Sequence, residues 1–95
     1  MTPEKEKLYG DILIDAILSL KDKKEARDFF SDLCTVTEIN AMSQRFVVAK
    51  MLHENKTYQD ISGETGASTA TISRVSRALN FGKNGYLNAI KRLSD

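Results

Sequence analysis

One stretch of this 95-residue chain, from Ser68 to Asn80, carries side chains suited to recognising a nucleic acid. Short or hydroxyl-bearing residues come first, two arginines follow, and no acidic residue interrupts them: Ser68, Thr69, Ala70, Thr71, Ser73, Arg74 and Arg77. Short side chains at the start of a helix let its backbone enter a major groove about 12 Å wide, while arginine pairs with guanine edges or binds phosphate. The pattern favours hydrogen bonding and ion pairing with duplex DNA.

Two short helices joined by a glycine turn would position these residues. Thr57 is a favoured N-cap type with Asp60 three residues later, and Ser68 could cap the second helix. Gly66 between them is the residue type that adopts a positive φ after a last helical turn. We therefore predict a helix-turn-helix over residues 57–80, with Thr57 and Gln59 added to the candidate DNA contacts.

The second predicted helix has a face suited to burial. Its apolar residues Ile72, Val75 and Leu79 recur at spacings of three and four, which places them toward the first helix and the core. The arginines then lie on the opposite face. A helical hairpin whose arginine face is merely solvated is the alternative interpretation.

Charge is unevenly distributed along the chain, although the formal net charge is only +1. Residues 1–40 hold six Lys/Arg and nine Asp/Glu, whereas residues 41–95 hold eight Lys/Arg and four Asp/Glu. Screening confines the field of exposed charges to about 8 Å at physiological salt, so an acidic N-terminal half would not cancel a basic surface elsewhere. The near-neutral average does not exclude a nucleic-acid partner.

The length of the chain predicts a single domain spanning residues 1–95. No apolar run is long enough to span a bilayer and no secretory leader is recognisable, so we expect a soluble, cytoplasmic protein. Cys34 is the one cysteine and cannot form an internal disulfide; we expect a partly buried small hydrophobe in preference to a reactive thiol.

The N-terminal third predicts two helices with wide apolar faces. The first spans Glu4 to Leu20, and the second follows a polar break at which Asp22 and Glu25 have the spacing of a capping box. The adjacent Phe29 and Phe30 lie on the second helix. We expect residues 1–33 to form a subunit interface, with a purely intramolecular core as the alternative.

A third helix, from Thr37 to about Glu54, is expected to be the central core helix. Its apolar face is predicted to comprise Ile39, Met42, Phe46, Ala49 and Leu52, broadened by Val47, Val48 and Met51. Residues Asn80 to Gly85 read as a linker because they hold two asparagines and two glycines, and a last helix is expected from Tyr86 to about Leu93. Lys50 and Lys56 are either phosphate contacts or solvated charges.

Residues for catalysis or metal binding are not identifiable. No Ser/His/Asp set, paired-carboxylate site or phosphate-binding glycine loop occurs, so we expect no enzyme activity. His53 lacks Cys or acidic partners at ligand spacing, and no metal site is expected.

The segment ETGASTATISRVSRAL resembles the helix-turn-helix of the tryptophan repressor family, and more closely that of its YerC/YecD-type relatives. Upstream, TEINAMSQRFVVAKMLHENKTYQDI resembles the helix that precedes the motif, so the resemblance covers nearly the whole chain. It implies an all-α, multi-helix fold of TrpR-like type that forms an intertwined homodimer. It also implies a DNA-binding transcriptional regulator, most simply a repressor, with one helix-turn-helix per operator half-site.

The resemblance also implies a ligand pocket, of which only part is retained. Arg45 and Arg74 match the two arginines that sandwich the corepressor's indole ring, and Thr35 matches a position near its amino group. Val75 stands where the typical repressor has glycine, and Ala78 where it has serine. We therefore expect no cofactor, and in particular no regulation by tryptophan.

Three classes of function remain open on the sequence. A DNA-binding regulator predicts affinity that falls steeply with salt, and a helical protein interaction module without DNA affinity predicts a complex indifferent to salt. An unrecognised enzyme requires a pocket with titratable groups, which the sequence does not supply. The regulator is the interpretation we expect.

Overall fold

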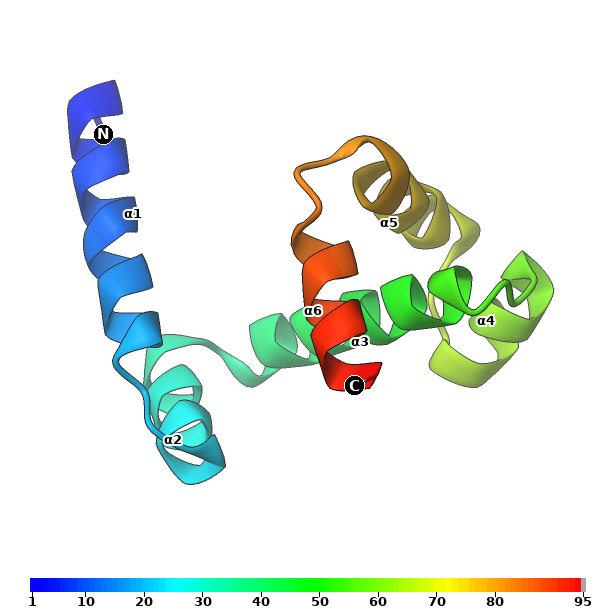
Figure 1. Cartoon of the computed structure of the whole chain (residues 1–95), viewed down its shortest axis with the longest axis horizontal. Coiled ribbons are helices and arrows are strands. Elements are labelled where there is room, and N and C mark those ends of the chain that lie inside the picture. Colours follow the sequence, from blue (N-terminus) through cyan, green and yellow to red (C-terminus); the bar gives the residue numbers. More distant parts are fainter. Residues whose placement is uncertain (95) are drawn as a thin grey trace. The chain divides into compact units, whose positions relative to one another are not determined.

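The computed structural model describes residues 1–94, which form six α-helices and no strand (Figure 1). This composition confirms the all-α prediction. The chain divides into two compact units, residues 1–36 and residues 37–95.

The first unit contains α1 (Pro3–Leu18) and α2 (Lys23–Leu33). At the start of α2 the Asp22 carboxylate accepts the Glu25 N–H at 2.8 Å, while the Glu25 carboxylate accepts the N–H of Lys21 at 3.3 Å. The predicted capping arrangement is therefore present, with the return bond made to the residue before the cap. Helix α1 ends two residues earlier than expected, where the Ser19 hydroxyl donates to the Ala16 carbonyl at 2.6 Å.

Neither helix of the first unit contains a buried side chain. Most apolar residues of α1 remain open to solvent, with exposed fractions from 38% to 57% for Leu8, Tyr9, Ile12, Leu13 and Ile14. On α2, Phe29 and Phe30 contact each other edge to face with ring centroids 5.5 Å apart. An apolar face of this width on an uncovered helix is a surface suited to another polypeptide.

The second unit is built on α3 (Val36–His53), of which only the first residue belongs to the first unit. It also contains α4 (Tyr58–Thr65), α5 (Thr69–Phe81) and α6 (Gly85–Ser94). All four helices and the α4–α5 turn contribute to one core: Val48, Ala49, Met51, Ile61, Ala67, Ile72, Val75 and Ile90. Phe46, Leu52, Leu79 and Tyr86 pack against it. The expectation that α3 is the central core helix is confirmed.

The predicted apolar face of α3 is only partly buried. The buried residues of α3, Val48, Ala49 and Met51, all lie in its C-terminal half. Met42 and Val47 were expected in the core but are 38% and 45% exposed. Met42 precedes the part of α3 on which the core gathers, whereas Val47 lies within that part, between Phe46 and Val48, on a side of the helix that the core does not cover.

The joint between α5 and α6 is shorter than expected. Asn80 and Phe81 continue α5, and the helix stops at Gly82, whose N–H donates to the Ala78 carbonyl at 2.9 Å. A Cβ at Gly82 would collide with the carbonyl oxygen of Ala78, so glycine is required here by close approach. Asn84 adopts a left-handed φ of 65° before α6 begins.

Candidate nucleic-acid interface

Both helices of the predicted motif begin at the expected caps. The Thr57 hydroxyl accepts the Asp60 N–H at 3.1 Å before α4, and the Ser68 hydroxyl accepts the Thr71 N–H at 3.1 Å before α5. Each bond satisfies one backbone donor that has no intrahelical partner. The predicted starts of both helices are confirmed.

The turn between α4 and α5 has the predicted left-handed glycine. Gly66 has a φ of 74°, and its N–H donates to the Ser62 carbonyl at 2.9 Å. The Thr65 hydroxyl donates to the Ile61 carbonyl at 2.7 Å and accepts the Ala67 N–H at 3.1 Å. Thr65 and Ala67 are functional residues that were not predicted from the sequence, although a hydroxyl before the glycine and an apolar residue after it were available signals.

Burial fixes which way α5 faces. Ile72 and Val75 are 0% and 2% exposed, and Leu79 packs against the same core. Ile61 of α4 and Ala67 of the turn lie in that core as well. The face of α5 opposite these residues is therefore the one available to a ligand.

Most of the predicted DNA contacts lie on that available surface. On α5 and at its cap, six of the predicted contacts are exposed: Ser68, Thr69, Ala70, Ser73, Arg74 and Arg77. At the start of α4, Thr57 and Gln59 are exposed. Thr71 differs, because it is half-buried and its hydroxyl accepts a bond from the Ser68 hydroxyl at 3.2 Å, which suits it to holding the cap.

The exposed face of α5 offers hydrogen-bond donors and positive charge together. Ser73 places a hydroxyl on it, and Arg74 and Arg77 place two guanidinium groups within one turn of each other. Helix α5 carries no acidic residue in its first turn and none before Asn80. A helix of this kind can enter a major groove, with arginines directed at base edges or phosphates.

The residues predicted to form a ligand pocket differ in burial and in the unit of the chain to which they belong. Arg45 is half-buried on α3, whereas Arg74 and Ala78 are exposed on α5. Val75 lies in the core, as the sequence predicted, and is 2% exposed. Thr35 belongs to the first unit. A pocket formed by all five residues stays a prediction.

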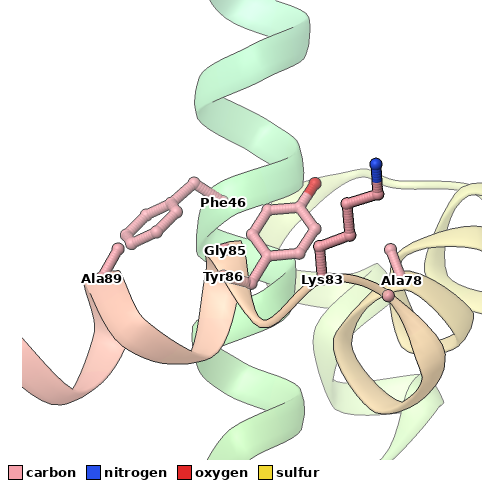
Figure 2. Close-up of a pocket in the computed structure, with 7 residues that line it drawn as sticks. Phe46, Ala78, Lys83, Gly85, Tyr86 and Ala89 are labelled. Atoms are coloured by element: carbon pink, nitrogen blue, oxygen red, sulfur yellow. The ribbon is translucent and has the colours of Figure 1, made fainter.

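An open hollow of about 450 Å³ does lie in the second unit, and Ala78 is part of its wall (Figure 2). Its other lining residues are Phe46, Gly82, Lys83, Gly85, Tyr86 and Ala89. The rings of Phe46 on α3 and Tyr86 on α6 have centroids 6.3 Å apart. The lining is mainly apolar, so the hollow suits an apolar group better than a charged one.

Other kinds of site find little support in the described residues. No group of three or more His, Cys, Asp or Glu within residues 1–94 is arranged to hold a metal ion. In the same range, no helix has the length and apolar character needed to cross a membrane. Cys34 is half-buried, as expected, at the end of α2.

Two capped helices around a left-handed glycine, with an exposed arginine-bearing face on the second, define a helix-turn-helix domain. The model of the Trp repressor protein family matches residues 10–94. The chain therefore belongs to the Trp repressor family, a family of DNA-binding regulators, and the resemblance recognised in the sequence is confirmed.

Individual relatives agree with this assignment. Over 93 residues the chain is 53% identical to YerC of Bacillus subtilis (strain 168), a match covering 95% of this chain and 89% of YerC. The crystal structure of a TrpR-like protein from Eubacterium eligens ATCC 27750 is 61% identical, with a TM-score of 0.86 over 88% of this chain and 87% of that one. A candidate Trp repressor from Staphylococcus aureus is 48% identical, with a TM-score of 0.90 over 99% of this chain and 95% of that one.

Proposed function

We propose that this protein is a sequence-specific DNA-binding transcriptional regulator, most simply a repressor, whose recognition helix is α5. The observation that carries the proposal is the exposed face of α5, which has no acidic residue and presents Ser73, Arg74 and Arg77. Ile72 and Val75 bury the opposite face in the core. Membership of the Trp repressor family supports it. As a regulator of transcription, the protein acts in the cytoplasm alongside the DNA.

The regulator acts as a homodimer in this proposal. The support is the uncovered apolar surface of α1, on which Ile12 is 57% exposed, together with the apolar hollow beside Phe46 and Tyr86. A small chain that leaves this much apolar surface open gains stability by pairing. Two-fold symmetry would set the two α5 helices about 34 Å apart in successive major grooves, so the operator is an approximate palindrome.

Tryptophan is not the effector in this proposal, and no cofactor is required. The support is Val75, whose side chain fills core space and is 2% exposed. An indole ring held between Arg45 and Arg74 would have to displace the two methyl groups of Val75. Overpacking of this kind costs about 1–3 kcal/mol, which weakens a micromolar dissociation constant by roughly 5- to 150-fold.

The decisive measurement is fluorescence anisotropy of a labelled duplex over a salt series. Sites selected from a random DNA library supply the duplex, and the logarithm of the affinity should fall linearly with the logarithm of salt. Replacing Arg74 or Arg77 with Ala should weaken binding by about 1–3 kcal/mol if that arginine reads a base. A phosphate contact would instead weaken all sequences alike and reduce the salt slope by about one.

The exposed Arg27 of α2 offers a matched control once analytical ultracentrifugation shows that Arg27→Ala is still a dimer. This variant removes the same charge outside the helix-turn-helix and should leave DNA affinity unchanged. Parent-like binding by the Arg74→Ala, Arg77→Ala double variant would overturn the assignment of α5. A protein that binds no duplex at low salt, but forms a salt-indifferent complex with another protein, would instead be a helical interaction module.

A further inference from the structure

A side chain of α3 reaches the turn of the helix-turn-helix. Gln44 is half-buried, and its Nε2 donates to the carbonyl oxygen of Thr65 at 3.0 Å. Thr65 is the last residue of α4, where carbonyl groups have no intrahelical N–H partner. The amide of Gln44 therefore caps the C-terminal end of α4 from a helix 21 residues away in the sequence.

The residue that Gln44 holds also shapes the turn. The hydroxyl of Thr65 donates back to Ile61 at 2.7 Å and accepts the N–H of Ala67 at 3.1 Å. Gly66 between them has a φ of 74°, and Ala67 is 2% exposed. Fixing the carbonyl of Thr65 thus fixes the peptide at which the chain leaves α4 and turns toward α5.

We infer that Gln44 is a positioning residue for DNA binding, which ties the α4–α5 turn to α3 and holds α5 in the orientation that presents Arg74 and Arg77. The inference rests on the proposed function. A side-chain donor is the chemical requirement, because the partner is a carbonyl oxygen that can only accept. Without the donor, the turn samples other orientations, and DNA binding must select the competent one from among them.

Two substitutions at this position separate the donor from the shape of the side chain. Gln44→Met keeps an unbranched chain and removes the donor, whereas Gln44→Lys keeps a donor that can reach the end of α4. Asn40 is exposed and lies one turn earlier on α3, so Asn40→Met and Asn40→Lys make the same chemical changes away from the turn. The lysine pair controls for added positive charge.

Affinity for the selected duplex is measured well below the melting temperature of every variant, so that all chains are folded. Gln44→Met should bind roughly 3- to 10-fold more weakly, the range expected for one lost hydrogen bond. Its salt slope should match the parent's, because no phosphate contact is lost. Gln44→Lys should regain affinity relative to Gln44→Met by more than Asn40→Lys gains over Asn40→Met.

Amide hydrogen exchange supplies a local measurement. In Gln44→Met the amides of Gly66 and Ala67 should exchange several-fold faster, while the core amides of Val48 and Ile72 keep their protection. A lower melting temperature with unchanged affinity would reduce Gln44 to a purely stabilising residue and overturn the inference, as would unchanged exchange at Gly66 and Ala67. If the parent binds no DNA, the proposed function fails. The exchange measurement still decides whether Gln44 holds the turn: faster exchange of Gly66 and Ala67 in Gln44→Met shows that it does, and parent-like exchange shows that it does not.

Discussion

Two glycines three residues apart should respond in opposite directions to the same substitution. Gly63 lies inside α4, and a Cβ built there meets no atom within 4 Å. Gly66 ends the same helix with a φ of 74°, and a Cβ there is equally unobstructed. Because neither site is crowded, the backbone conformation alone distinguishes them, and alanine tests that conformation directly.

The expected free energies follow from the two conformations. Alanine at Gly63 should stabilise the protein by roughly 0.5–1 kcal/mol, since glycine loses more backbone entropy in a helix. Alanine at Gly66 should destabilise it by roughly 1–2 kcal/mol, since an L-residue with a Cβ is strained at positive φ. Gly66→Asn should cost less than Gly66→Ala, because the chain already places Asn55 and Asn84 at φ values of 62° and 65°.

Urea unfolding followed by circular dichroism measures these differences, at one fixed protein concentration because pairing would make stability depend on it. The free energies of unfolding of the two alanine variants should differ by about 1.5–3 kcal/mol. In thermal unfolding, each kcal/mol should move the melting temperature by about 4–8 °C. Equal shifts for Gly63→Ala and Gly66→Ala, or a stabilised Gly66→Ala, would refute the left-handed turn on which the placement of α5 depends.

Three further outcomes are expected. Gly82→Ala should destabilise the protein by about 1–3 kcal/mol in the same urea assay, because the Cβ of the alanine would collide with the Ala78 carbonyl. An unchanged free energy of unfolding would show that α5 ends differently. Ile12→Lys, which places a charge on the apolar face of α1, should give monomers in analytical ultracentrifugation at micromolar concentration, whereas Glu6→Lys, at a position of α1 that is already charged, should stay dimeric. A dimeric Ile12→Lys would contradict the proposed interface. Calorimetric titration with tryptophan should give no low-micromolar dissociation constant for the parent, whose Val75 is buried, and such a constant would count against the proposal.

The local features of the helix-turn-helix could be predicted because they depend on residues close together in the sequence. The caps at Thr57 and Ser68 each bond to an N–H three residues later, and Gly66 acts through its own φ. Such signals are complete within a few residues. The starts of both helices, the end of α4 and the buried face of α5 could therefore be predicted without a structure.

The bond from Gln44 to Thr65 could not be predicted, because it joins residues 21 positions apart. In the sequence, no local pattern distinguishes Gln44 from the other polar residues of α3. Periodicity likewise identifies an apolar face without saying how much of it a neighbour covers, so Met42 and Val47 were wrongly assigned to the core. The end of α5 was misplaced because Asn80 is compatible with a helix, while the requirement for glycine at position 82 arises from backbone geometry.

The uncovered face of α1 has a consequence for the amount of active protein. A 16-residue helix with no buried side chain is only marginally stable alone in water and takes its stability from whatever covers it. In the proposed homodimer, the ordering of residues 1–36 and the pairing of two chains are then one equilibrium. At low expression the concentration of competent regulator would rise with the square of the chain concentration, so a twofold change in synthesis would produce close to a fourfold change in protein able to occupy an operator.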